Sequence, residues 1–437
     1  MAGQGRVARP AYRLAAVSAA AVALLAGGLT GAGATEGRAA QPEGRYVIVL
    51  EDSARDRLDA IVREHGRNHG VRPGFRYRHA LVGYSAVVPE SRVAALRAER
   101  DVKAVAPDTP VFATQQVLPT GVDRIEGDLS STAAGDGTGA VDTAVAILDT
   151  GIDDDHRDLD VAGGVNCMNP ARPGAWRDNN GHGTHVAGTV AARDNGDDVV
   201  GVAPGARLYA VKVLGANGRG SASNIICGLD WVANNAATLG IKVANMSLGG
   251  DGSDDGNCGF TNEDPYHQAI CRVVDDRGVL VVASAGNSAD DLAAHRPAAY
   301  DEVLTVTAMA DFNGLPGGGA ASTCRTDEDD TAANFSSFAV SAADAAHTIA
   351  GPGVCIESTR NRGRTTVFSG TSMASPHVAG AAALCLTGPC AGMTPAQVAD
   401  KLRADAAAQP ASYGFAGDPN APVTGRFYGH LVHTGGY

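Results

Sequence analysis

Residues 369–380 read SGTSMASPHVAG and run directly into Ala381-Ala382-Ala383-Leu384. Small turn-forming residues followed by small apolar ones predict a helix that begins near Ser372. A serine on the first turn of a helix projects its hydroxyl outward, and its own N–H faces the place where an oxyanion would form, a charge that the helix dipole favours. Pro376 lies close enough to the helix start for its missing N–H to cost little. The alternative is an ordinary Ala-rich buried helix with a Ser/Thr cap.

Two further stretches favour catalysis. Residues 143–148 form an apolar run typical of a strand buried on both faces, and this run ends in Asp149-Thr150-Gly151. Residues 180–188, NGHGTHVAG, open a second Gly/Ala-rich helix that contains His182. Asp149, His182 and Ser372 can therefore meet at one edge of a parallel sheet, in the chain order Asp, His, Ser. An α/β-hydrolase would show the order Ser, Asp, His with a G-x-S-x-G motif, and position 374 is Ala instead of Gly.

These motifs resemble those of the subtilisin-like serine proteases, the subtilases, from about Tyr46 to the C-terminus. The resemblance implies that Ser372 is the nucleophile, His182 the general base and acid, and Asp149 the orienting carboxylate. Asn287, in Ser284-Ala285-Gly286-Asn287, would donate its side-chain amide to the oxyanion. Structural roles are expected for His156, His185 and His377.

Composition fits a globular secreted protein. The 437 residues are 44% hydrophobic and include 56 Gly, and the net charge is −13. Residues 1–114 hold 16 Lys+Arg against 11 Asp+Glu and are net positive, so the net negative charge of the chain comes from the remainder. An acidic body argues against nucleic acid as a partner.

The N-terminal segment 1–34 is expected to be a signal peptide. Arg6, Arg9 and Arg13 precede an Ala/Leu/Val/Gly-rich stretch that ends in the small residues Ala32-Gly33-Ala34. A membrane anchor is the alternative, disfavoured because the stretch is weakly apolar and no basic stop-transfer run follows. Residues 35–45 are expected to be a linker, and no later segment is apolar enough to span a bilayer.

All eight cysteines follow residue 114, an even set that predicts disulfides rather than thiol catalysis. Their spacing suggests the pairs Cys258–Cys271 and Cys385–Cys390, which leaves Cys324–Cys355 and Cys167–Cys227. Sequence alone leaves the connectivity open.

Residues 46–114 show a β-α-β-β-α-β order, a ferredoxin-like α+β layout. It resembles the subtilase propeptide, which assists folding and inhibits the enzyme until it is cut; an unrelated small binding domain is the alternative. The family's spacing puts the cut between Thr114 and Gln115, so the peptidase domain would be 115–437.

The peptidase domain alternates strands and helices, which predicts a mostly parallel sheet with helices on both faces, the doubly wound α/β architecture that the resemblance also implies. Strands are expected at 143–149, 207–214, 241–247, 279–284 and 303–309. Helices are expected from His182, at 221–239, 264–277 and 394–406, and at Ser372.

The resemblance also assigns the substrate-binding residues. Ser247-Leu248-Gly249 and Gly218-Arg219-Gly220 would form two edges between which a peptide adds as a strand, held by backbone hydrogen bonds that imply broad specificity. Ser284, Ala285 and Gly286 would also contact substrate. Ala222, Ile225 and Leu248 would line the pocket for the fourth residue before the cleaved bond, which should favour Phe or Leu because Ala222 is small. The bond Arg296–Pro297 is expected to be cis.

Calcium is the expected cofactor. The resemblance implies one oxygen-only site made by Gln116, Asp158, Asn195 and the carbonyls of Arg193, Asp197 and Val199; a plain polar loop is the alternative. The acidic runs Asp251, Asp254, Asp255 and 327–330 are expected to be solvated loops, with an extra ion site as the alternative.

Together these features predict a secreted, calcium-stabilised, subtilisin-like serine endopeptidase, made as an autoprocessed zymogen and expected to be a monomer. Its partners would be protein and peptide substrates and its own propeptide. The alternatives are an esterase and a catalytically inert binding protein on a protease scaffold.

Overall fold

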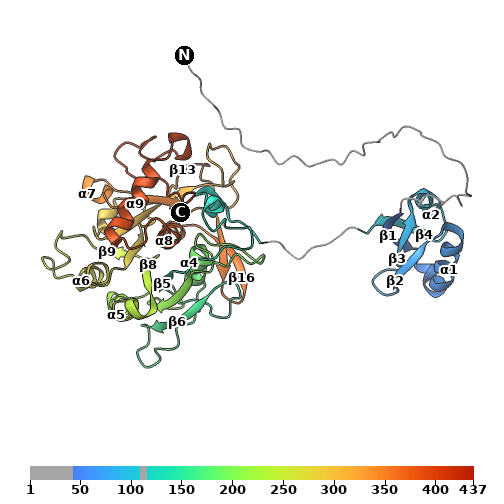
Figure 1. The fold of residues 1–437 in the computed structure, drawn as a ribbon, viewed down its shortest axis with the longest axis horizontal. Helices are drawn as coiled ribbons and strands as arrows, with labels where there is room; N and C mark the ends of the chain where they lie inside the picture. Colours follow the sequence, from blue (N-terminus) through green and yellow to red (C-terminus); the bar gives the residue numbers. More distant parts are fainter. Residues whose placement is uncertain (1–42, 109–115) are drawn as a thin grey trace, which may run out of the picture. The chain divides into compact units, whose positions relative to one another are not determined.

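A computed structural model of the chain describes residues 43–108 and 116–437. The chain divides into two units, with the boundary between Val111 and Phe112 (Figure 1). The expected signal peptide and the expected cut after Thr114 lie outside the described residues. Within the described part of the chain, no helix combines the length and the apolar character needed to cross a membrane.

The first unit has the expected β-α-β-β-α-β order. Its four strands form an antiparallel sheet in the order β2-β3-β1-β4. The first strand starts at Glu43, inside the expected linker, because Glu43 pairs with Pro89 and so extends the antiparallel ladder. The elements are β1 (Glu43–Leu50), α1 (Leu58–His69), β2 (Arg72–Tyr77), β3 (Gly83–Pro89), α2 (Val93–Arg97) and β4 (Val102–Pro107).

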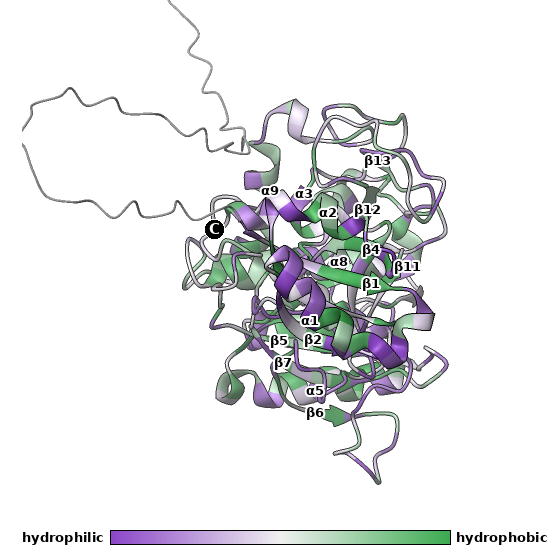
Figure 2. Ribbon diagram, turned by 90° about the vertical axis from the view of Figure 1, so that its right-hand side faces the viewer, coloured by the Kyte–Doolittle hydropathy of each residue, from purple (hydrophilic) through white to green (hydrophobic). Residues whose placement is uncertain are grey.

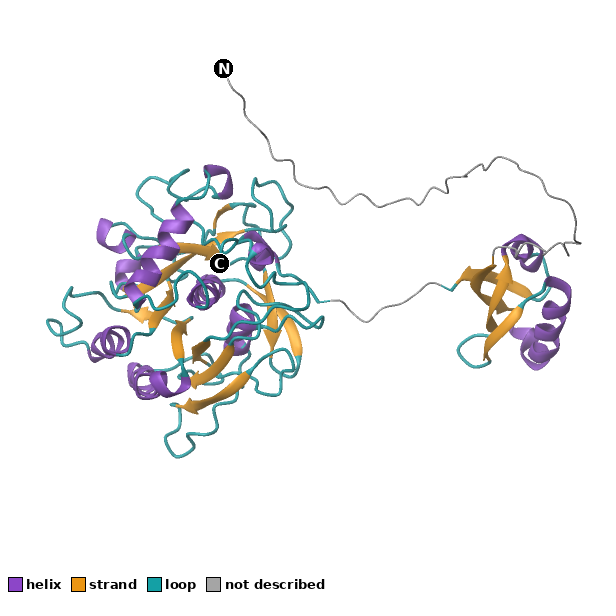
Figure 3. Cartoon of the chain, viewed as in Figure 1, coloured by secondary structure: helices purple, strands orange, loops and turns teal. Residues whose placement is uncertain are grey.

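One face of this small sheet is covered by the two helices (Figure 3). Ile48 and Leu50 of β1 pack with Leu58 and Ile61 of α1 in a single buried cluster. Figure 2 shows β1 largely in the green of hydrophobic residues, whereas α1 also carries hydrophilic turns. The unit thus has a hydrophobic core of its own.

The second unit is built on an eight-stranded sheet. Seven strands run in the order β13-β12-β10-β8-β5-β7-β6, and β14 pairs with β12. All pairings are parallel except that of β13 with β12. The strands are β5 (Ala144–Asp149), β6 (Val161–Asn166), β7 (Arg207–Lys212), β8 (Ile241–Met246), β10 (Leu280–Ser284), β12 (Val303–Ala310), β13 (Thr331–Ala332) and β14 (Thr348–Pro352).

Helices cover both faces of this sheet, as predicted. Val145 and Ile147 of β5 point into one hydrophobic cluster with α4, α8 and α9, whereas Ala146 and Leu148 point into a second cluster with α5 and α6. The period of two along β5 therefore separates the two layers. These helices are α4 (His182–Ala191), α5 (Ala222–Leu239), α6 (Pro265–Cys271), α8 (Thr371–Leu386) and α9 (Pro395–Ala407).

Smaller elements complete the second unit. Two antiparallel pairs join β9 to β11 and β15 to β16, and two short helices flank the sheet. Their bounds are α3 (Thr120–Arg124), α7 (Ala342–Ala345), β9 (Gly250–Asp251), β11 (His295–Arg296), β15 (Ile356–Arg360) and β16 (Arg364–Phe368).

Covalent features agree with the sequence predictions. Four disulfides join Cys167–Cys227, Cys258–Cys271, Cys324–Cys355 and Cys385–Cys390. The Arg296–Pro297 peptide bond is cis.

The prediction of a solvated loop at 327–330 is wrong. Asp329 and Asp330 are buried, because both carboxylates accept backbone N–H bonds: Asp329 from Phe312 and Ala320, Asp330 from Gly317 and Gly318. Asp330 also lies 2.8 Å from the guanidinium of the fully buried Arg124. These acidic residues therefore hold their own loop in place.

Candidate active site

The candidate site lies where the strand order reverses. Asp149 ends β5, an interior strand with β7 on one side and β8 on the other. Ser247 follows the end of β8 directly. Ligand sites in open α/β sheets lie outside the carboxyl ends of the strands at such a switch point.

Asp149 and His182 are in direct contact. His182 is the first residue of α4, and its Nδ1 lies 2.8 Å from Asp149 Oδ1 and 2.9 Å from Oδ2. The Asp149 side chain is fully buried, whereas that of His182 is 27% exposed. Because Asp149 accepts at Nδ1, the ring carries its proton there and Nε2 is free to act as a base.

Two opposing effects set the proton affinity of His182. Burial acts to lower the pKa of His182, but the charge and hydrogen bond of Asp149, with the charge of Asp178, outweigh it and raise the pKa above its ordinary value. By contrast, burial lowers the pKa of His185 to about 3 and that of His377 to about 4. Those two rings are neutral and bond to backbone carbonyls, which supports their expected structural roles.

Sequence reasoning missed Asp178, a buried carboxylate at the start of α4. It holds the turn that presents His182, because it binds donors on both sides of that residue. A local signal was present: Asp followed by two Asn just before a helix is typical of an N-terminal cap. The donors to Asp178 are the hydroxyls of Thr150 and Thr184 and the N–H groups of Asn180, Gly181 and Thr184.

Ser372 is the second residue of α8. Its hydroxyl donates to Ser247 O at 3.3 Å, so among the described residues its hydrogen bond goes to the neighbouring strand end rather than to His182. In return, the Ser247 hydroxyl donates to Ser372 O at 2.8 Å. Pro376 lies in the interior of α8 and cannot donate to Ser372 O, four residues earlier, so the Ser247 hydroxyl supplies the bond that the proline removes.

Asn287 lies beside the start of the same helix. Its Oδ1 accepts from Thr371 N at 2.8 Å and from Thr371 Oγ1 at 3.0 Å. These two donors define which side of the amide is oxygen, and they leave Nδ2 free to donate. A Cβ atom built on Gly370 would lie 3.6 Å from both Asn287 Nδ2 and Ser372 N. The two N–H donors therefore border the same small space.

A cleft of about 430 Å³ adjoins His182 and Ser372. Most of the predicted substrate residues line it, whereas Ala222, Asn287 and residues 284–286 are not among its lining. A larger hollow of about 730 Å³ lies at the opposite, amino ends of the strands, beside Arg207 and Lys242, away from these groups. The cleft is lined by Thr150, Asn180, His182, Leu214, Gly218, Arg219, Gly220, Ile225, Ser247, Leu248, Gly249 and Ser372.

Five of the predicted calcium ligands lie in contact with one another in two groups. Gln116 Nε2 lies 2.6 Å from Arg193 O and 2.9 Å from Val199 O, and Asn195 Nδ2 lies 2.9 Å from Asp158 Oδ1. For both amides to present oxygen to a common centre they must rotate, which breaks the bonds that Gln116 Oε1 accepts from Gly196 N and Asn195 Oδ1 accepts from Asp197 N. Burial raises the pKa of Asp158 to about 7, and the hydrogen bonds from Val199 and Asn195 and the charge of Arg157 offset this only in part. The donor set fits a hard cation such as Ca²⁺.

Comparison with known proteins gives two family matches. Residues 141–426 match the subtilase family, and residues 45–114 match the peptidase inhibitor I9 family. Among similar proteins, Subtilisin E of Bacillus subtilis (strain 168) is 34% identical over 83% of this chain and 85% of its own length. An alkaline protease of Alkalihalobacillus alcalophilus is 39% identical over 67% of this chain and 66% of its own length.

Solved structures are similar as well. A cold-adapted subtilisin-like serine proteinase superposes with a TM-score of 0.52 and 28% identity, covering 74% of this chain and 99% of that one. In sequence, Subtilisin Savinase of Lederbergia lenta is 41% identical over 62% of this chain and 84% of its own length. The two family matches together span both the sheet that carries the site and the smaller first unit.

Proposed function

This chain belongs to the subtilase family of serine proteases, and on that premise we propose that it is a secreted endopeptidase of broad specificity, made as a zymogen. The observation that carries the proposal is the contact of His182 Nδ1 with the buried Asp149, beside Ser372 on the first turn of α8.

The proposed mechanism starts with Ser372 as the nucleophile. Rotation of its hydroxyl away from Ser247 O brings it toward Nε2 of His182, which takes its proton as Oγ attacks the peptide carbonyl. Asp149 stabilises the resulting imidazolium. His182 then protonates the leaving amine, and water hydrolyses the acyl-enzyme by the same steps in reverse order.

Charge that develops on the carbonyl oxygen is stabilised by two donors, Asn287 Nδ2 and the Ser372 N–H. Both border the space beside Gly370. In addition, the positive end of the α8 dipole favours a negative charge there. Removal of one such donor typically costs about 3–4 kcal/mol of transition-state stabilisation.

Substrate would bind in the cleft as an extended strand. The edges Ser247-Leu248-Gly249 and Gly218-Arg219-Gly220 both line it, and they offer backbone groups that do not discriminate between side chains. Ala222 is proposed to border the pocket that Ile225 and Leu248 line, and Ser284, Ala285 and Gly286 to contact the parts of the substrate that extend beyond this cleft.

Calcium would be held by Gln116, Asp158, Asn195 and the carbonyls of Arg193, Asp197 and Val199, and would tie the loop after α4 to the N-terminal end of the second unit. The first unit, which matches the inhibitor I9 family, is proposed to inhibit the enzyme within the same chain until it is cut off.

The test is a fluorophosphonate probe on the purified protein with casein and a simple ester as substrates. We expect labelling at Ser372 and casein hydrolysis. Labelling with ester turnover alone would support an esterase, and the absence of labelling would support an inert scaffold.

The zymogen is tested with Ser372→Ala in a host that lacks other proteases. We expect the variant to fold normally, to lack turnover and to keep the first unit covalently attached. Recovery of a normally processed chain would exclude self-processing and leave the catalytic proposal intact.

Side-chain preference is tested with peptides that differ only at the fourth residue before the cleaved bond. Ile225 and Leu248 line the cleft, and Ala222, one helical turn before Ile225, carries only a methyl group, so Phe and Leu should give higher kcat/KM than Ala by burying more apolar area. Equal values for Ala and Phe would mean that this pocket is closed.

A further inference from the structure

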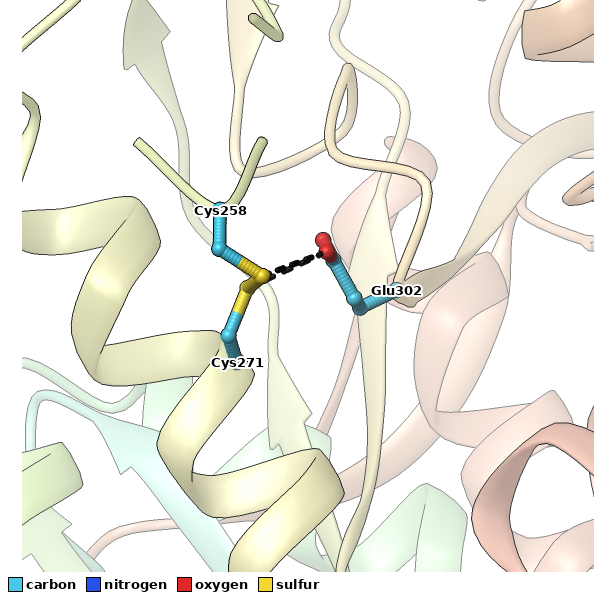
Figure 4. Close-up of side chains that lie close together, drawn as sticks. All are labelled: Cys258, Cys271 and Glu302. Atoms are coloured by element: carbon cyan, nitrogen blue, oxygen red, sulfur yellow. Dashed lines mark hydrogen bonds between the residues drawn. A yellow bond between two sulfur atoms is a disulfide. The ribbon is translucent and has the colours of Figure 1, made fainter. Parts of the chain in front are cut away.

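A cluster of acidic groups surrounds His267 on α6, and none of its residues lines the cleft beside Ser372. Asp254 and Asp255 come from the loop between β9 and α6, and Glu302 directly precedes β12. The Cys258–Cys271 disulfide fixes this loop to the end of α6 (Figure 4). Glu302 Oε1 lies 3.1 Å from both sulfur atoms, which are joined to each other and carry no proton.

The ring of His267 is held rigidly. Its side chain is fully buried and stacks on Tyr300, with ring centroids 3.9 Å apart and an interplanar angle of 2°. Nε2 lies 2.8 Å from Glu302 Oε2. A carboxylate accepts only, so Nε2 carries a proton and donates it. In the neutral ring this arrangement leaves the lone pair on Nδ1.

Nδ1 of His267 is buried and has no hydrogen-bond partner among the described residues. It faces Asp254 Oδ1 at 3.6 Å and Asp255 Oδ1 at 3.7 Å. These separations are too long for hydrogen bonds, and they place a nitrogen lone pair opposite two carboxylate oxygens. The Nδ1 lone pair and the two carboxylate oxygens face one another without forming hydrogen bonds. The space between them can hold a cation.

We propose that Asp254, Asp255 and His267 bind a divalent transition-metal ion of the Zn²⁺ class. One imidazole nitrogen and two carboxylate oxygens are common zinc donors, and water completes the coordination. Glu302 supplies the outer carboxylate that typically receives the other N–H of a metal-bound histidine. A nitrogen ligand disfavours Ca²⁺ at this site, since calcium sites are made of oxygen.

The two carboxylates contribute differently. Asp254 Oδ1 accepts one hydrogen bond, from Gly256 N, and keeps capacity for a metal. Asp255 accepts four backbone N–H bonds, from Asn257, Gly259, Thr261 and Asn262. These bonds fold the loop around Asp255 and hold its charge in position, so it is the weaker ligand and an unsuitable target for mutation.

The competing occupant is a proton. Burial acts to lower the pKa of His267, but the hydrogen bond and charge of Glu302, with Asp254 and Asp255, raise it. An imidazolium would then form ion pairs with the acidic groups. The two occupants, a metal ion and a proton on Nδ1, are distinguishable. A metal ion that binds displaces the proton, whereas a site that only holds an ion pair binds no metal.

The experiment uses the full chain with Ser372→Ala, which prevents self-digestion, in excess Ca²⁺ to occupy the oxygen-only site. Zn²⁺ binding is measured by calorimetry in two buffers of different protonation enthalpy, and Co²⁺ binding by its visible absorption. His267→Gln places an amide N–H where Nε2 was, keeping the donor to Glu302 while removing Nδ1. Asp254→Asn keeps an acceptor for Gly256, and Asp276→Asn is an exposed control at the end of the π-helical segment after α6.

We expect the parent to bind one more Zn²⁺ than His267→Gln, with proton release and a Co²⁺ spectrum. Asp254→Asn and Glu302→Gln should each weaken binding by roughly tenfold or more, and Asp276→Asn should have no effect. Equal Zn²⁺ binding by the parent and His267→Gln overturns the proposal. If His267→Gln does not fold, unchanged affinity in both Asp254→Asn and Glu302→Gln overturns it.

Discussion

At the scale of single residues, the charge of Asp149 controls the proton affinity of His182. Because only the neutral imidazole can accept the serine proton, kcat/KM should rise with pH as His182 loses its proton. Asp149 raises the pKa of His182 against the effect of burial. Asp149→Asn should therefore shift the rise of kcat/KM, the acid limb of the pH profile, to lower pH. It should also lower the maximal rate by about four orders of magnitude. The measurement is kcat/KM for a chromogenic peptide across the neutral range.

Asp276→Asn is the matched control for this prediction, since it removes an exposed carboxylate far from His182. Its acid limb should stay where it is in the parent. If the acid limb of Asp149→Asn also stays at the pH of the parent, a group other than His182 produces it. His182 would then not be the base whose titration limits the rate.

The residue types of the candidate site are predictable because the chemistry demands them. Asp149, His182 and Ser372 stand out through strand-end and helix-start patterns that do not depend on distant contacts. Asp178 does not stand out to the same degree, since its function is to collect N–H and hydroxyl donors that converge only once the turn has formed. The hydrogen bond between Ser247 and the carbonyl of Ser372 likewise joins residues 125 positions apart.

At the scale of elements, α8 depends on a side chain from outside the helix. The Ser247 hydroxyl donates to the carbonyl that Pro376 leaves without a helical partner. Ser247→Ala should destabilise the fold by about 1–3 kcal/mol, the usual cost of an unsatisfied buried acceptor. Denaturant unfolding of variants in the Ser372→Ala background measures this free energy.

Pro376→Ala provides the test of cause. It restores an N–H at position 376, so the loss from Ser247→Ala should shrink when both changes are combined. If the loss of unfolding free energy in the double variant equals the sum of the losses in the two single variants, the Ser247 hydroxyl does not substitute for the helical bond.

Strands were predicted correctly where the local sequence pattern is strong. They were missed where a strand forms only through pairing with a neighbour. The apolar strands β5, β7, β8, β10 and β12 were predicted within a few residues. β6 was missed because it contains Gly163 and Gly164, which have low strand propensity, and it forms only by pairing with β7. The acidic run 327–330 was misread because its backbone donors come from residues 312–320.

At the scale of the whole molecule, a bound calcium would join the loop after α4 to residue 116. It would stabilise the folded state and not the unfolded state. At free Ca²⁺ a hundredfold above Kd the ligand contributes about 2.7 kcal/mol. Excess chelator should therefore lower the melting temperature of the Ser372→Ala chain, as measured by circular dichroism.

Asp158→Asn is the matched variant for this prediction. It should melt at a lower temperature than the parent in Ca²⁺, and chelator should change its melting temperature little. A parent that is insensitive to chelator would remove the proposed site.

The tight burial of α8 also bears on how this protein can evolve. The helix is lined with Ala374, Ala379 and Ala381–Ala383, all without solvent exposure, and a Cβ on Gly380 would lie 2.7 Å from Val202 Cβ. In a saturation library, enlarged side chains along this helix should be depleted even when selection is for expression alone. The helix that presents Ser372 is thus among the least mutable parts of the chain, and new specificities are more accessible through the loops that line the cleft.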